Sequence, residues 1–155
     1  MTDAWITTSS TNPEAVLNPL IAACEQGFVP DRLYHLESDD IAEEMSQVRD
    51  VAQTVVKRYG DKDLQINNTS VPSDPDFDLI HTYIKSSMDN IEEDCTIAVD
   101  ITPGRKFMTA ITFATGLQNG ADHVYYLYLN PRRYGLLYPE LPRTATTLYD
   151  FTEVL

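Results

Sequence analysis

The segment at residues 96–101 reads Thr-Ile-Ala-Val-Asp-Ile, and as an extended strand it would present apolar side chains on both faces. Such a strand is typical of the middle of a parallel sheet, because helices cover both sides of that sheet. Four further strand-like segments alternate with helical patterns, at residues 4–8, 32–36, 64–68 and 123–129. The sequence therefore predicts an α/β fold, a Rossmann-like three-layer sandwich with a mainly parallel sheet.

The helical segments are bounded by capping residues and by glycines or other turn residues. They lie at about residues 13–27, 38–60, 73–91 and 105–118, the third starting at Ser73-Asp74-Pro75. Right-handed crossovers between these elements give the strand order 3-2-1-4-5. The loops after the first and fourth strands would then share the crevice in which open α/β sheets bind their ligands.

The length of 155 residues is that of a single domain. We expect a Rossmann-like core over about residues 4–130. The extension at residues 131–155 has an irregular pattern, with short strands expected near 135–138 and 146–151. Neither an internal repeat nor a low-complexity linker divides the chain.

The composition also bears on the compartment. The chain contains no apolar run of the roughly 18 residues that a membrane span requires, and it does not open on a basic, apolar leader. Neither membrane insertion nor secretion is therefore expected. Cys24 and Cys95 both fall in or beside apolar patterns, so we expect a buried, reduced pair and a cytoplasmic location.

Acidic residues dominate the charge, with 24 Asp and Glu against 11 Lys and Arg and a formal net charge of -13. A carboxylate-rich, lysine-poor surface suits a protein from a halophilic source, and an ordinary acidic cytosolic protein is the alternative. In both cases the net charge opposes binding to duplex nucleic acid. A small anion held by a local cationic pocket remains compatible with this charge.

The loop after the first strand, residues 7–13, reads Thr-Thr-Ser-Ser-Thr-Asn-Pro at the expected start of a helix. Hydroxyls beside the free N–H groups of a helix can form a neutral site for an anion or a ribose. Ser and Thr in such a turn are also common capping residues, which is the structural alternative. The G-x-G-x-x-G dinucleotide motif and the Walker A motif are both absent from the sequence.

The loop after the fourth strand carries Gly104, Arg105 and Lys106 at the start of the next helix. Two cations here would oppose the positive end of the helix dipole, so their presence favours a bound anion. The structural alternative is that Arg105 pairs with surface acids and that Lys106 extends along the surface. Asp100, at the end of the strand, is expected either to cap the loop or to orient Lys106.

Residues 100–108 read Asp-Ile-Thr-Pro-Gly-Arg-Lys-Phe-Met, which resembles a D-x-T-x-G-x-K-x-M signature. That signature follows the fourth strand of CARF domains, the CRISPR-associated Rossmann-fold sensors of cyclic oligoadenylates. The Thr-Ser-Ser-Thr-Asn-Pro loop is similar to the first ligand loop of that family. The resemblance covers roughly residues 4–130, and this chain departs from the family in having Pro103 where a second glycine is common.

The resemblance implies a homodimer that binds a cyclic oligoadenylate across its two-fold axis, with no metal and no cofactor. A ring with two-fold symmetry suits an interface with two-fold symmetry, because each subunit contacts an identical half of the ring. Thr102 would hold the second loop in place. The residues that would contact ribose or phosphate are Thr8, Ser9, Ser10, Thr11, Gly104, Arg105 and Lys106.

Some members of the family are ring nucleases, and we expect no winged-helix, HEPN or nuclease effector domain in a chain of this length. In metal-free cleavage a ribose 2′-OH attacks the neighbouring phosphodiester, and Ser10 and Lys106 are the candidate catalytic residues. One alternative is a sensor or interaction subunit without catalysis. Another is an unrelated Rossmann-like domain that binds a different phosphate compound. The three histidines, His35, His81 and His123, are expected to be structural.

Overall fold

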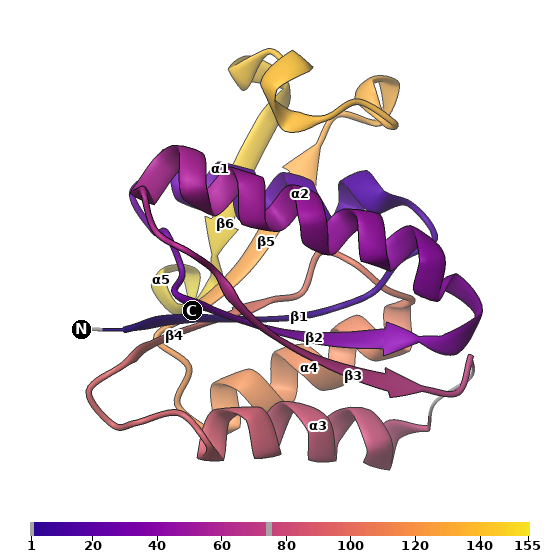
Figure 1. The fold of residues 1–155 in the computed structure, drawn as a ribbon, viewed down its shortest axis with the longest axis vertical. Coiled ribbons are helices and arrows are strands. Elements are labelled where there is room, and N and C mark those ends of the chain that lie inside the picture. Colours follow the sequence, from indigo (N-terminus) through magenta and orange to yellow (C-terminus); the bar gives the residue numbers. More distant parts are fainter. Residues whose placement is uncertain (1, 74–75) are drawn as a thin grey trace.

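A computed structural model of the chain describes residues 2–73 and 76–155. It contains a six-stranded sheet flanked by helices (Figure 1). The strands are β1 (Asp3–Thr8), β2 (Arg32–Ser38), β3 (Gln65–Val71), β4 (Thr96–Asp100), β5 (His123–Leu129) and β6 (Thr146–Asp150). The helices are α1 (Pro13–Glu25), α2 (Ala42–Gly60), α3 (Phe77–Asp89), α4 (Lys106–Gln118) and α5 (Phe151–Val154).

The strand order is β3-β2-β1-β4-β5-β6. Strands β1 to β5 are parallel, and β6 pairs antiparallel with β5. Helices α1 and α2 cover one face of the sheet, and α3 and α4 cover the other (Figure 1). The predicted three-layer, Rossmann-like fold and the order 3-2-1-4-5 are confirmed, with one strand added at the β5 edge.

Two apolar cores lie on opposite faces of the sheet, as alternation of side chains along the central strands requires. Trp5 of β1 is fully buried on the α1 and α2 side, where its ring stacks on Tyr125 with centroids 5.6 Å apart. Ile6, the next residue, is equally buried on the α3 and α4 side. Ala98 and Val99 divide between the two cores in the same way, which confirms that the fourth strand is buried on both faces.

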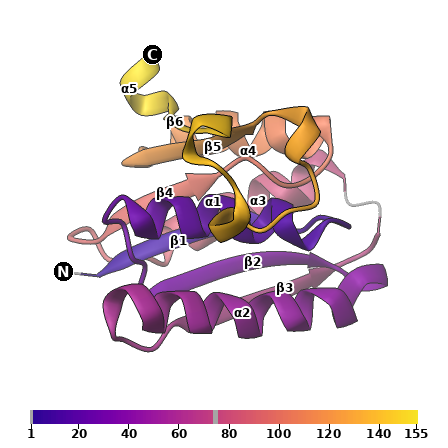
Figure 2. The same cartoon turned by 90° about the horizontal axis from the view of Figure 1, so that it is seen from above.

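The part of the C-terminal extension that precedes β6 folds over the α1 side of the sheet (Figure 2). The strand predicted near 146–151 is present as β6. The prediction of a strand near 135–138 is wrong. A 3-10 turn forms instead at Tyr138–Glu140. The side-chain amide of Asn18 binds this segment, donating to Leu136 O (2.9 Å) and accepting from Tyr138 N (2.8 Å). These backbone groups therefore pair with a buried side chain of α1 instead of with a neighbouring strand.

Most element ends agree with the sequence patterns. The predicted start of the third helix falls partly on residues 74 and 75, which lie outside the described residues. The described helix α3 begins after Asp76, whose carboxylate accepts from Leu79 N at 2.8 Å. Strands β2 and β3 each continue beyond their predicted ends, to Ser38 and Val71. In the described part of the chain, no helix combines the length and the apolar character needed to cross a bilayer.

Candidate functional site

The loops after β1 and β4 touch each other at the carboxyl edge of the sheet, where the strand order reverses. The Thr8 hydroxyl donates to Pro103 O at 3.4 Å. Gly104 has a φ of +96°, and a Cβ at this position would lie 3.2 Å from Thr8 Oγ1. Glycine is therefore required here both for the positive φ and for the close approach of the two loops.

Asp100 connects the two loops through hydrogen bonds to its side chain. Its carboxylate is fully buried and accepts from the Thr7 hydroxyl (3.0 Å) and from Thr102 N (3.0 Å). The Thr102 hydroxyl oxygen in turn accepts from Leu127 N at 3.0 Å. Burial raises the pKa of Asp100 to about 7, although the hydrogen bonds from Thr102 and Thr7 act in the opposite direction. Of the two roles expected for Asp100, its contacts are those of a residue that fixes the loop.

A polar hollow of about 260 Å³ opens between the loops that follow β1, β2 and β4. Five of the residues expected at the site line it together, namely Ser9, Ser10, Thr11, Gly104 and Arg105. The remaining described lining residues are Asn12, Ser38, Asp40, Ile41, Ser73 and Met108. Hydroxyl groups from the loop after β1, from the end of β2 and from the segment after β3 therefore face one space, together with one guanidinium and one carboxylate.

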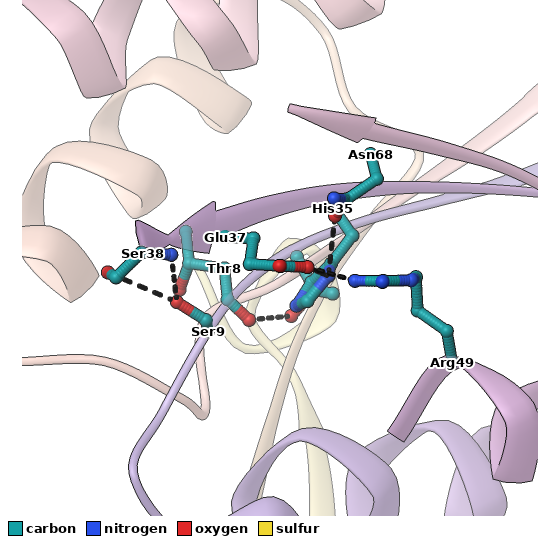
Figure 3. Close-up of polar contacts among 8 residues, drawn as sticks. Thr8, Ser9, His35, Glu37, Ser38, Arg49 and Asn68 are labelled. Carbon is teal, nitrogen blue, oxygen red and sulfur yellow. Dashed lines mark hydrogen bonds and ion pairs between the residues drawn. The ribbon is translucent and has the colours of Figure 1, made fainter. Parts of the chain in front are cut away.

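The hydroxyls of the first loop differ in their exposure and in the hydrogen bonds that they already make within the chain. Ser9 is buried, and its hydroxyl oxygen accepts from Ser38 N at 3.2 Å (Figure 3). Thr8 is also buried, beneath the hollow, and its hydroxyl donates to the second loop. Ser10 is partly exposed, and its oxygen accepts from Asn12 N at 3.1 Å, which leaves its proton free to donate. Ser10 and the exposed Thr11 are thus the hydroxyls best able to contact a ligand.

The N-terminus of α4 faces the same loops. Arg105 occupies the N-cap position, and its side chain makes no capping hydrogen bond to the first turn. The first N–H groups of a helix have no partner within the helix, and together with the dipole they attract anions. Arg105 is exposed and adds a guanidinium to the same hollow.

Lys106 lies on the other side of the Gly104 turn. It lines a second hollow of about 490 Å³, which Thr102 and Gly104 also line. The walls of this hollow are largely apolar, and Phe151 packs against Phe113 and Tyr126 there, with centroids 5.5 and 6.3 Å apart. Lys106 is exposed, and no described carboxylate pairs with it. Within one chain the two expected catalytic residues therefore line different hollows, and Gly104 lines both.

Sequence reasoning missed Ser38 and Asp40, which β2 brings into the first hollow. From the sequence alone the Ser38-Asp39-Asp40 run is typical of a helix cap, because hydroxyl and carboxylate residues before a helix usually have that role. Neither Ser38 nor Ile41 makes a side-chain capping bond to the helical segments that follow. The position of these residues directly after a parallel strand was the available signal, because that is where such sheets bind ligands.

A buried ion pair joins β2 to α2 (Figure 3). Glu37 of β2 is 2% exposed and forms an ion pair with Arg49 of α2. His35 is buried next to them, with Nδ1 3.2 Å from Asn68 Oδ1 and 3.8 Å from Glu37 Oε2. Burial lowers the pKa of His35 to about 4, although the hydrogen bond to Asn68 Oδ1 acts in the opposite direction, so the imidazole is neutral near pH 7.

No group of three or more His, Cys, Asp or Glu side chains suited to a metal ion occurs among residues 2–73 and 76–155. The side-chain donors and acceptors among the described lining residues of the first hollow are hydroxyls, a guanidinium, the Asn12 amide and one carboxylate. Such a set suits a ligand that combines anionic and hydroxyl groups. Neither a protein-family model nor a curated protein matches the sequence of this chain.

Proposed function

We propose that the chain binds a cyclic oligoadenylate as a homodimer and cleaves it without a metal ion. The observation that carries the proposal is the joining of the two predicted loops. Ser9, Ser10 and Thr11 line one hollow with Gly104 and Arg105. The second loop is the Asp-Ile-Thr-Pro-Gly-Arg-Lys-Phe-Met stretch that resembles the CARF signature. Such a ligand would connect the chain to type III CRISPR signalling and antiviral defence.

The arrangement of the two hollows favours a ligand larger than one nucleotide. They lie on either side of the Gly104 turn, with Arg105 in the first and Lys106 in the second. A ring with one phosphate per nucleotide can meet both cations, whereas a mononucleotide offers a phosphate at one end only. Two such loops related by a two-fold axis would enclose the whole ring.

In the proposed reaction a ribose 2′-OH gives up its proton to solvent while its oxygen attacks the adjacent phosphorus, and the bond from phosphorus to the 5′-oxygen breaks. The products are a 2′,3′-cyclic phosphate and a 5′-hydroxyl, which takes up a proton from solvent or from a side chain. Ser10 would orient the 2′-OH, and Lys106 and Arg105 would stabilise the charge that develops on the phosphoryl oxygens. Because Ser10 and Lys106 of one chain line different hollows, we propose that each half-site combines Ser10 of one subunit with a cation of its partner.

The same separation favours a second candidate function, a sensor that binds the ring and does not cleave it. A protomer in which the two expected catalytic residues line different hollows can bind phosphates without aligning an attack. In that case the bound ring would stabilise the dimer and act through another protein. The alternative of an unrelated phosphate compound as ligand is tested by the same experiment.

The experiment is incubation of the purified chain with labelled cyclic tetra-adenylate and cyclic hexa-adenylate, with and without EDTA, at low and high salt. Light scattering gives the oligomeric state. A dimer that cleaves a ring in EDTA supports the proposal. A dimer that binds without turnover supports the sensor. A monomer, or a chain that binds neither ring at either salt concentration, contradicts both.

Ser10 and its neighbours separate catalysis from binding. A hydroxyl that aligns the attacking group should lower the rate at saturation, whereas one that only contacts the ligand should weaken binding alone. We expect at least one of Ser9→Ala, Ser10→Ala and Thr11→Val to slow saturated cleavage by about tenfold or more, roughly 1.4 kcal/mol of barrier. The exposed Ser46 of α2 provides the control Ser46→Ala. Wild-type rates in all three variants would contradict the catalytic role.

Lys106→Ala should weaken ring binding by about 1.5 to 3 kcal/mol, the range for a hydrogen bond that involves a charged group. Stability should change little, because Lys106 is exposed and pairs with no described carboxylate. Calorimetric titration of the ring into wild type and variant measures the loss. Lys57→Ala removes an equally positive, exposed side chain from α2 and should leave affinity unchanged. Equal affinities for wild type and Lys106→Ala would show that this charge has no role in binding.

A further inference from the structure

Asp40 is the feature of the first hollow that the proposed phosphate contacts leave unexplained. It follows the end of β2 and lines the hollow together with Ser10 and Arg105. It is exposed, and among the described residues its carboxylate has neither an ion pair nor a hydrogen bond. It is also the only carboxylate among the described lining residues.

A carboxylate in this position constrains which part of a ligand can lie beside it. An ionised carboxylate only accepts hydrogen bonds, and it repels a phosphate. The phosphate must therefore lie toward Arg105 and the N-terminus of α4, and a hydrogen-bond donor of the ligand must face Asp40. Strands β2 and β4 flank β1, so these two ends of the hollow are about two strand spacings, or roughly 10 Å, apart at the backbone.

The contacts around β1 fix the segment that carries Asp40. Ser38 N donates to Ser9 Oγ at 3.2 Å, and the two hydroxyl oxygens lie 3.4 Å apart (Figure 3). The end of β2 is thereby tied to the first ligand loop. The carboxylate of Asp40 therefore lies beside the loop after β1, and hydrogen bonds to the end of β2 hold that loop in place.

We infer that Asp40 accepts a hydrogen bond from a ribose 2′-OH and so selects ribonucleotides over deoxyribonucleotides. This inference rests on the proposed function and names a specificity-determining residue for it. Adenosine groups supply the required donor only through their sugar hydroxyls and the exocyclic amine. In dinucleotide-binding sheets of the same strand order, an acidic residue downstream of the phosphate loop accepts from this hydroxyl. Removal of the hydroxyl removes a hydrogen bond to a charged acceptor, so a deoxy ring should bind more weakly.

The test measures binding and not cleavage, because a deoxy ring has no 2′-OH to attack with. Wild type, Asp40→Ala and Asp39→Ala are titrated with cyclic tetra-adenylate and with its all-2′-deoxy counterpart. Adenosine 3′-phosphate and its 2′-deoxy form are titrated in parallel. Alanine is used because asparagine would keep an oxygen able to accept from the 2′-OH. Asp39→Ala is the matched control, since it removes an equal charge from the adjacent exposed residue, which is not among the described lining residues.

We expect wild type and Asp39→Ala to bind the ribose ring about tenfold or more tightly than the deoxy ring. In Asp40→Ala this ratio should fall to within about twofold, with the loss confined to the ribose ring. If Asp40→Ala changes the affinities for both rings by the same factor, the inference is overturned while ring binding stands.

Failure of the proposed function gives a different result. If wild type binds neither ring, the proposed function is overturned and the 3′-phosphates decide the role of Asp40. A 2′-OH preference that Asp40→Ala abolishes then supports the inference for a simpler nucleotide ligand. Absence of binding to all four compounds overturns both.

Discussion

Replacing Arg49 by alanine should lower the free energy of unfolding by about 3 kcal/mol, within the range measured when one partner of a buried ion pair is removed. Its partner Glu37 has a side chain that is 3% exposed, so the remaining carboxylate would be buried without a counter-charge. His35 is adjacent but is neutral at pH 8, because burial lowers its pKa to about 4. Urea unfolding at pH 8 measures the difference.

Two further variants separate charge from packing in this prediction. Arg58→Ala removes an exposed arginine from the same helix and should change stability by less than about 0.5 kcal/mol. The double variant Glu37→Gln/Arg49→Ala has no unpaired charge, so it should be more stable than Arg49→Ala alone. If Arg49→Ala and Arg58→Ala unfold at the same urea concentration, Glu37 is hydrated in solution and the ion pair does not contribute to stability.

Replacing Asp100 by asparagine should stabilise the chain above pH 7 by on the order of 3 kcal/mol. Burial raises the pKa of Asp100 from 3.8 to about 7, so the fold favours the protonated carboxyl. Its contribution to stability is complete below pH 4 and is lost as the pH rises toward 7. Asparagine stays neutral, and it can accept from Thr102 N and donate to the Thr7 hydroxyl. Urea unfolding between pH 4.5 and 8.5 should show a difference that grows with pH.

Asp150 provides a comparison of opposite sign. Burial acts to raise its pKa, but hydrogen bonds from His123 and Thr152 outweigh burial and the pKa is lowered. The stability that Asp150 contributes is therefore present near neutrality and is lost in acid. Asp150→Asn should be less stable than wild type at pH 8. A pH-independent difference between Asp100→Asn and wild type would show that Asp100 titrates normally in the fold.

Replacement of Asp100 also bears on the site, because this residue connects the two loops. Its carboxylate accepts from Thr7 in β1 and from Thr102 in the loop before α4. Asparagine keeps both hydrogen bonds and should preserve the position of Gly104. Ring binding by Asp100→Asn is therefore expected to remain close to wild type, even though its pH profile of stability changes.

The sequence was sufficient to predict the sheet because its signals are local. Burial of residues 96–101 on both faces follows from a run of apolar residues, and helical spacing identifies the connecting segments. Right-handed crossovers then leave few strand orders open. The meeting of the loops after β1 and β4 follows from that order. Ser10 and Gly104 could therefore be assigned to one crevice before any contact was known.

The contacts that distinguish individual site residues required the tertiary structure. Ser9 and Thr8 look equivalent to Ser10 in the sequence, but their hydroxyls bond to Ser38 and Pro103. These hydrogen bonds join residues that are separated by 29 and by 95 positions in the sequence, and hydrophobic periodicity contains no information about them. The same holds for Lys106, which the turn at Gly104 directs into a hollow apart from Ser10.

The sequence by itself determined the layers, the parallel strand order and the meeting of the loops after β1 and β4, because these depend on hydrophobic periodicity and chain connectivity. Only the tertiary structure decided that β6 pairs with β5, that Glu37 pairs with Arg49, and that Asp40 lines the first hollow. Each of these depends on which side chains are brought together by packing between distant segments. A polar residue beside a helix start has the same local signature whether it caps that helix or faces a ligand.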